Sequence, residues 1–131
     1  MTKRGEAMKV LVTGATGFLG RHLVRALQAR GNTVVALARD PDAAARGGAA
    51  RNAGVEGVTW MKGDILDAAS VRAVMEGCDG VYHCAGVVSR DPAQSDALWR
   101  VHVLGTRHVL DAARAAGVRR AVVASTSGTG A

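Results

Sequence analysis

The chain has 131 residues, enough for one domain with a buried core and too few for two. Hydrophobic residues make up 48% and charged residues 21%, as in ordinary soluble proteins, and no apolar run approaches the roughly 20 residues that a membrane span needs. The net charge of +6 makes nucleic acid a partner to weigh, but the 14 arginines are scattered and aromatic residues make up only 3%, which argues against it.

Residues 1–7 are polar and show no structural pattern, so we expect a disordered extension followed by one domain over residues 8–131. No apolar core with a cleavage site marks a signal peptide, and we therefore expect a cytoplasmic protein. Cys78 and Cys84 lack the spacing of a zinc site or a redox pair and are expected to be buried free thiols. The four histidines form no known ligand set, so the sequence predicts no metal site.

The first half of the domain alternates strand and helix. Residues 9–13 form a short apolar run rich in β-branched side chains, which predicts a buried strand. Apolar residues recur at helical spacing over residues 18–30, and Gly31 follows as the expected end of that helix. Residues 33–38 predict a second buried strand. Residues 42–53, rich in alanine, arginine and glycine, fit either a weak helix or a loop.

The second half continues this alternation. Strands are predicted over residues 58–62, 80–85 and 120–125, and a helix capped by its first residue, an aspartate, over residues 67–76. A long helix is predicted over residues 91–117. Its apolar stripe comprises Leu98, Val101, Val103, Leu104, Val109, Leu110 and Ala113. The alternation predicts an α/β fold of the Rossmann type, with a doubly wound parallel sheet of order 3-2-1-4-5.

A glycine-rich segment joins the first strand to the first helix and reads TGATGFLG over residues 13–20. Gly14 permits a tight turn, Gly17 lets the backbone approach a pyrophosphate, and Gly20 lets the helix pack closely. Backbone N–H groups at the start of the helix would face the phosphates; this stretch includes Thr16, Phe18 and Leu19. The alternative is a tight turn that binds nothing, but the strand–turn–helix context favours a dinucleotide site.

The pattern Thr-Gly-x-x-Gly-x-x-Gly resembles the extended short-chain dehydrogenases/reductases, the group of the NAD-dependent epimerases and dehydratases. Further stretches that fit this family follow in order at residues 63–67, 83–86, 105–106, 112–118 and 125–127. Residues 35–41 most resemble the dihydroflavonol reductase and 3β-hydroxysteroid dehydrogenase branch. The resemblance runs from about residue 9 to residue 131 and implies the NAD(P)-binding portion of an oxidoreductase or epimerase/dehydratase.

The residue after the second strand bears on the choice of cofactor. An acidic residue there would bind the ribose 2′-hydroxyl of NAD. Here Arg39 follows Ala38, and a guanidinium pairs well with a 2′-phosphate, so the sequence favours NADP over NAD. A merely solvated arginine is the alternative, and Asp40, one residue later, keeps NAD open.

The family resemblance supplies further cofactor contacts. It implies that Asp64 accepts a hydrogen bond from the adenine amino group and that Ile65 packs against the ring. The alternative for Asp64 is a turn or cap residue. Ala85, Gly86 and Val87 come at the end of the fourth strand and are expected to lie under the pyrophosphate and the nicotinamide ribose, because open α/β sheets bind ligands at the carboxyl ends of their strands.

The family's catalytic groups are a serine or threonine hydroxyl and the pair Tyr-x-x-x-Lys, in which the tyrosine is the general acid/base. The resemblance gives the hydroxyl role to Thr126, with Ser125 beside it. The pair is absent from this sequence, where Tyr82 is the only tyrosine and is expected in the core, and Lys62 is the last lysine. His102 stands where the family often has asparagine and is expected to be a packing residue rather than a catalyst.

Three interpretations follow, in order of preference. The first, which the missing Tyr-x-x-x-Lys pair supports, is a C-terminally truncated or partial NADP-dependent reductase or sugar-nucleotide epimerase/dehydratase relative that binds a dinucleotide and is catalytically incomplete as given. The second is a non-catalytic module that senses NADP(H), and the third is a nucleic-acid binder. The family resemblance implies a homodimer formed through helices, of which this sequence contains only the one over residues 91–117; the oligomeric state and the substrate stay open.

Overall fold

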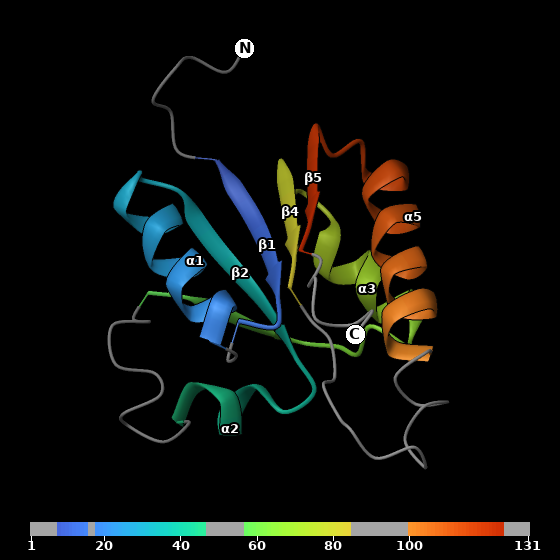
Figure 1. Ribbon diagram of the computed structural model, residues 1–131, viewed down its shortest axis with the longest axis horizontal. Coiled ribbons are helices and arrows are strands. Elements are labelled where there is room, and N and C mark those ends of the chain that lie inside the picture. Colours follow the sequence, from blue (N-terminus) through green and yellow to red (C-terminus); the bar gives the residue numbers. More distant parts are fainter. Residues whose placement is uncertain (1–7, 16–17, 47–56, 85–99, 125–131) are drawn as a thin grey trace, which may run out of the picture.

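The computed structural model describes residues 8–15, 18–46, 57–84 and 100–124, and Figure 1 shows how their elements are arranged. Within these segments, parallel strands form one sheet in the order β3-β2-β1-β4-β5, which confirms the predicted Rossmann-type topology. The strands are β1 (Lys9–Thr13), β2 (Thr33–Ala38), β3 (Thr59–Lys62), β4 (Gly80–His83) and β5 (Arg120–Val123). The helices are α1 (Phe18–Ala29), α2 (Pro41–Arg46), α3 (Ala68–Met75) and α5 (Thr106–Ala116), and a π-helical turn, η2 (Arg100–Gly105), precedes α5.

The central strand β1 contributes side chains to two cores, one on each face of the sheet. Val10 and Val12 pack with Val24 and Leu27 of α1. Leu11, between them, packs with the side chains of α3 and α5. Figure 1 shows α1 on one side of the sheet and α3 and α5 on the other. Burial on both faces explains why this strand is a continuous apolar run rather than an alternating one.

The helix predicted over residues 91–117 is present where the structure describes it, as the π-helical η2 followed by the α-helix α5, which ends at Gly117. Residues 91–99 lie outside the described residues, and the chain then forms η2 before α5 begins. Gly105 lies at this junction, where a Cβ would be 2.7 Å from the Cδ1 atom of Ile65. The change from a wide to a regular helical turn therefore coincides with a close approach to the segment that follows β3.

The apolar stripe predicted for that helix is correct only in part. Val109 and Ala113, four residues apart, are buried against the sheet and α3. Val103 and Leu110 are instead 42% and 41% exposed. Leu110 follows Val109 and is turned about 100° around the helix axis, so both cannot face the sheet.

The segment after β2 begins as a helix. Of the two alternatives for residues 42–53, the structure shows the helix, α2, although it starts at Pro41, a residue well suited to a first turn. Residues 47–56 lie outside the described part of the chain. No helix in the described segments is long and apolar enough to span a membrane.

Helix α3 starts with the aspartate cap that the sequence predicts. The Oδ1 atom of Asp67 accepts hydrogen bonds from the backbone N–H groups of Ala69 and Ser70 at 3.2 and 3.5 Å. We expect Asp67→Ala to lower the free energy of unfolding by about 1 kcal/mol, because both donors lose their acceptor. Urea denaturation measures the loss, and Asp67→Ser, which keeps a capping oxygen, is the control. Equal unfolding midpoints for Asp67→Ala and the wild type would contradict the role of the cap.

Candidate functional site

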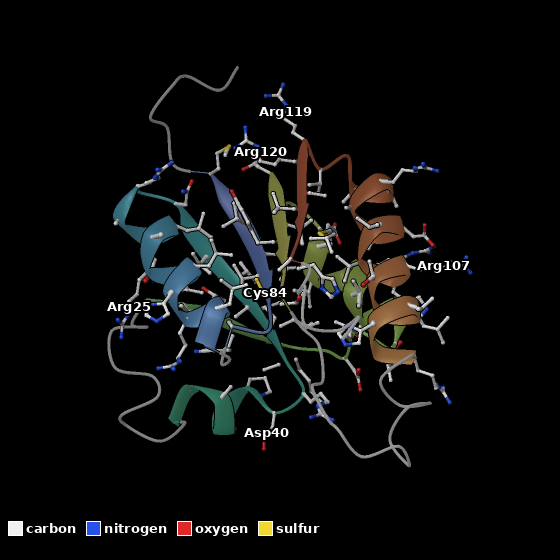
Figure 2. All side chains as sticks on the ribbon, viewed as in Figure 1. Arg25, Asp40, Cys84, Arg107, Arg119 and Arg120 are labelled. Carbon is white, nitrogen blue, oxygen red and sulfur yellow. The ribbon has the colours of Figure 1, made fainter. Side chains whose placement is uncertain are left out.

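The candidate site lies at the edge of the sheet where the parallel strands have their carboxyl ends. Thr13 pairs with His83 at the ends of β1 and β4, and Ala38 pairs with Lys62 at the ends of β2 and β3. The segments that follow these strands therefore emerge side by side, which is where open α/β sheets bind ligands. In Figure 2, Cys84, the residue after β4, lies toward this edge.

The glycine loop is packed so tightly that one of its positions admits no side chain. Gly14 has φ +71°, a left-handed conformation that favours glycine. A Cβ on Gly20 would lie 2.7 Å from the carbonyl carbon of Gly14, 2.8 Å from the Cα of Ala15, and nearer still to the Gly14 oxygen. The close packing predicted for Gly20 is therefore present, and its contact is with the backbone of the loop itself.

The other residues of this loop are described only in part. Leu19, in the first turn of α1, is 53% exposed, so its side chain contributes little to the core. Phe18 is the first residue of α1, and its side chain is not described. Thr16 and Gly17 lie outside the described residues. The part that is described places the N-terminus of α1 at the carboxyl edge of β1.

Arg39 is the first residue after β2 and is exposed, as is Asp40 after it. The backbone N–H of Gly63 donates to the carbonyl of Ala38 at 2.9 Å. This bond continues the pairing of β2 and β3 beyond their last paired residues, so that the segments starting at Arg39 and Asp64 begin next to each other. The two residues predicted to contact the adenosine end of a dinucleotide thus come from neighbouring strand ends.

Asp64 adopts the turn role that was its alternative assignment. Its Oδ1 atom accepts the backbone N–H of Leu66 at 2.9 Å, and its carbonyl accepts the N–H of Asp67 at 2.8 Å. Ile65, at the start of this turn, is only 9% exposed, because its side chain packs into the core formed with α3 and α5. Most of the Ile65 side chain is therefore unavailable to an adenine ring, while the Asp64 carboxylate is half-buried at the surface.

A buried chain of polar side chains links the ends of β1 and β4 to α5. The Oγ1 atom of Thr13 lies 2.6 Å from Nδ1 of His83, whose Nε2 lies 3.1 Å from Oγ1 of Thr106. The N–H of Cys84 donates to the same Thr13 hydroxyl at 3.1 Å. His83 is 3% exposed and Thr13 is fully buried. These hydrogen bonds hold in place the C-terminal end of β1, from which the glycine loop emerges.

The sequence does not indicate these hydrogen bonds, because they depend on the register between strands that are 70 residues apart. Burial lowers the pKa of His83, and the nearby charge of His102 lowers it further. His83 is therefore neutral at neutral pH and has one donor and one acceptor nitrogen for its two threonine partners. His102, which was expected to pack, is exposed, so that expectation is wrong. The hydrogen bonds of Thr13, His83 and Thr106 join the ends of β1 and β4 to the first residue of α5.

The fold and the glycine loop agree with comparisons to known proteins. Residues 10–130 match the model of the NAD dependent epimerase/dehydratase family. The chain belongs to this family. It is an extended short-chain dehydrogenase/reductase, and its curated relatives include cinnamoyl-CoA reductases and proteins like dihydroflavonol reductase, which agrees with the branch that residues 35–41 resemble.

Three comparisons give the extent of this likeness. The chain is 44% identical over 125 residues to cinnamoyl-CoA reductase 1 of Oryza sativa subsp. japonica, covering 95% of this chain and 36% of that protein. It is 40% identical over 114 residues to a putative dihydroflavonol 4-reductase of Synechocystis sp., covering 87% and 31%. A short-chain dehydrogenase/reductase superfamily protein from Agrobacterium tumefaciens, solved with bound NAD, is 36% identical with a TM-score of 0.73, covering 90% and 32%. The chain thus spans about a third of the length of these relatives.

Several residues predicted from the family resemblance lie outside the described residues. They are Ala85, Gly86, Val87, Ser125 and Thr126. Tyr82, expected in the core, is half-buried and packs against the core on the α1 side. Within the described segments, no three or more histidine, cysteine, aspartate or glutamate side chains could together hold a metal ion.

Both cysteines are free, as the sequence predicts, but their burial differs. Cys78 is buried, whereas Cys84 is half-buried. Burial raises the pKa of the Cys84 thiol. Burial is also the largest cause of the raised pKa of Cys78, which the charge of Lys9 lowers in part and that of Asp79 raises further. Both thiols are therefore neutral at neutral pH and are poor nucleophiles.

Proposed function

We propose that this chain is the dinucleotide-binding portion of an NADP-dependent reductase in the extended short-chain dehydrogenase/reductase family. The observation that carries the proposal is the packing of Gly20 on the backbone of Gly14 and Ala15, which leaves no room for a Cβ. This contact brings the N-terminus of α1 against the turn after β1, so that N–H groups and the helix dipole favour the charge of a pyrophosphate. The residues present therefore fit a dinucleotide.

The preference for NADP rests on Arg39. The side chain is exposed at the carboxyl edge of β2, beside the turn that contains Asp64. A guanidinium there can pair with two oxygens of a ribose 2′-phosphate at once, whereas NAD offers it only a hydroxyl. The homologue from Agrobacterium tumefaciens was solved with bound NAD, so Arg39 alone supports a preference of this chain for NADP.

The chemistry of the whole protein is a further part of the proposal. The bound nicotinamide supplies the hydride, and by family resemblance Thr126 and Ser125 orient the substrate oxygen. The 131 residues contain no Tyr-x-x-x-Lys pair to move the proton. We therefore expect this 131-residue chain by itself to bind the dinucleotide without reducing a substrate by the family mechanism.

A nucleic-acid function is less well supported by the positions of the charges. Figure 2 shows Arg25 on α1, Arg107 on α5 on the opposite side of the molecule, and Arg119 and Arg120 at the end of the sheet away from the candidate site. These four arginines do not share one face. Binding driven by phosphate contacts needs a continuous basic surface that tracks the backbone.

A fluorescence titration of the 131-residue chain with NADPH and with NADH tests the proposed function. Saturable binding that is tighter for NADPH is the expected result. Arg39→Ala should weaken NADPH binding by roughly tenfold to a hundredfold, the value of a hydrogen bond to a charged group, and leave NADH binding nearly unchanged. Arg107→Ala, which removes the same charge from an exposed position on α5, is the matched control and should change neither.

The outcomes separate the parts of the proposal. Failure of a folded sample to bind either dinucleotide contradicts the proposed function. Equal losses for NADPH and NADH in Arg39→Ala would mean that Arg39 contacts a group the two cofactors share, such as the adenine face. An unchanged affinity for NADPH would mean that Arg39 is a solvated surface residue.

A further inference from the structure

The turn after β3 is held from the side by α5. Nδ1 of His108 lies 2.7 Å from the backbone carbonyl of Ile65, a residue 43 positions earlier in the chain. A carbonyl oxygen only accepts, so Nδ1 carries the proton and donates it. Gly105 also lies close to this residue, since a Cβ there would be 2.7 Å from Cδ1 and 3.1 Å from Cγ1 of Ile65. The first turn of α5 thus lies directly against the Asp64 turn.

The bond from His108 restrains more than one backbone atom. The carbonyl of Ile65 and the N–H of Leu66 belong to the same planar peptide group. That N–H donates to Oδ1 of Asp64 at 2.9 Å. The C=O and the N–H point in opposite directions within this plane, so a bond that fixes the carbonyl also fixes the direction of the N–H, and with it the orientation of the Asp64 carboxylate.

The second helix beside this turn acts on a different part of Asp64. The backbone N–H of Asp64 donates to Oγ of Ser70 at 3.0 Å, and this hydroxyl lies 3.1 Å from the Asp64 carbonyl. The Ser70 hydroxyl also lies 2.8 Å from the carbonyl of Asp67. These contacts from α3 hold the main chain of Asp64 but leave its side chain free to rotate. The rotation of the carboxylate is restrained through Leu66 and hence through His108.

We propose that His108 is a positioning residue for the adenine half of the dinucleotide. It acts through the Ile65–Leu66 peptide plane to hold the Asp64 carboxylate at the carboxyl edge of β3, where it meets the adenine amino group. This inference rests on the proposed function of the chain. A carboxylate that is already oriented loses less conformational freedom when the ligand binds, so the bond contributes to affinity as well as to stability.

The test compares the two halves of the dinucleotide in the full 131-residue chain. ADP-ribose, which contains the adenine, and nicotinamide mononucleotide, which does not, are titrated separately into each variant. His108→Leu should weaken ADP-ribose binding by up to about tenfold, the equivalent of one hydrogen bond, and leave nicotinamide mononucleotide unchanged. His108→Asn places an amide nitrogen where Nδ1 lies and should retain the wild-type affinity. Leu110→Ala, on the exposed side of the same helix, is the control.

A double-mutant cycle shows whether His108 acts through Asp64. In the Asp64→Ala background, His108→Leu should cause no further loss of ADP-ribose affinity, because the group that it positions is gone. Additive losses, or equal affinities for His108→Leu and the wild type, overturn the inference while leaving the proposed function intact. A wild-type chain that binds neither ADP-ribose nor NADPH would contradict both the inference and the proposed function.

A measurement on the wild-type chain keeps the inference testable if His108→Leu does not fold. Hydrogen exchange reports directly on the Leu66 amide, which the inference requires to be held against the Asp64 carboxylate. Slow exchange of this amide in the wild type and in His108→Asn is expected. Exchange as fast as that of an unstructured peptide would show that the peptide plane is not fixed, and would overturn the inference.

Discussion

Replacing Gly20 with alanine is expected to abolish dinucleotide binding and to lower the free energy of unfolding by about 3 kcal/mol. The added Cβ would lie 2.7 Å from the carbonyl carbon of Gly14 and 2.8 Å from the Cα of Ala15. Both are backbone atoms, so no side-chain rotation can relieve the overlap. Helix α1 would have to move away from the turn after β1, which would displace the N–H groups proposed to face the pyrophosphate.

The sign of the effect distinguishes this mechanism from helix propensity. Alanine is a better helix former than glycine by roughly 1 kcal/mol, so propensity alone predicts that Gly20→Ala stabilises α1. The matched control is Gly31→Ala, just beyond the other end of the same helix, where a Cβ would have no atom within 4 Å and the backbone has φ +87°. We expect that control to lose about 1–2 kcal/mol from the left-handed conformation and to bind dinucleotide normally. Thermal unfolding and NADPH titration measure both variants; a Gly20→Ala chain that is stabilised and binds normally would contradict the packing role.

Those features that depend on short stretches of sequence could be predicted well. The bounds of β1 and β2 agree with the prediction, because each strand is an apolar run buried on both faces and is ended by a residue that interrupts the ladder. The cap at Asp67 and the left-handed Gly117 after α5 also agree, since both are local hydrogen-bond arrangements that particular residues favour. The strand order also agrees with the prediction, since the strand–helix alternation together with the glycine loop after the first strand is typical of the Rossmann topology.

Features that depend on contacts between distant residues could not be predicted. Gly105 fits the family pattern, but nothing in the sequence indicates that it lies against the side chain of Ile65. His108 gives no sequence signal of its bond to a carbonyl 43 residues away. The role of Gly20 was the exception, because the glycine spacing carries information about a tertiary contact within eight residues.

His83 provides the second large expected effect. Substitution by leucine, which is similar in volume, should lower the free energy of unfolding at neutral pH by about 2–3 kcal/mol, because it removes one partner each from the buried Thr13 hydroxyl and from Thr106. Thr106→Val removes only the outer bond of the chain and should lose about 1 kcal/mol. A cycle of Thr13→Ala with His83→Leu should be clearly non-additive, since the two side chains are 2.6 Å apart.

The pH dependence of stability gives an independent test of the same residue. Burial lowers the pKa of His83 in the folded chain, whereas in the unfolded chain it takes the ordinary value of about 6.5. Between these two pKa values the unfolded state binds more protons than the folded state, so the free energy of unfolding falls as the pH drops below about 6.5. The limiting slope is about 1.4 kcal/mol per pH unit. Above about pH 7.5 the free energy of unfolding does not depend on His83.

The difference in stability between wild type and His83→Leu should therefore be largest near pH 8 and shrink toward pH 5. In Thr106→Val, His83 stays buried beside Thr13, so the decline of stability with falling pH should persist. Urea denaturation at fixed intervals from pH 5 to pH 8 measures the free energy of unfolding of the wild type, His83→Leu and Thr106→Val. If the free energies of unfolding of the wild type and of His83→Leu differed by the same amount at every pH, His83 would not stay neutral in the folded protein. The hydrogen bonds of Thr13, His83 and Thr106 would then not depend on the uncharged imidazole.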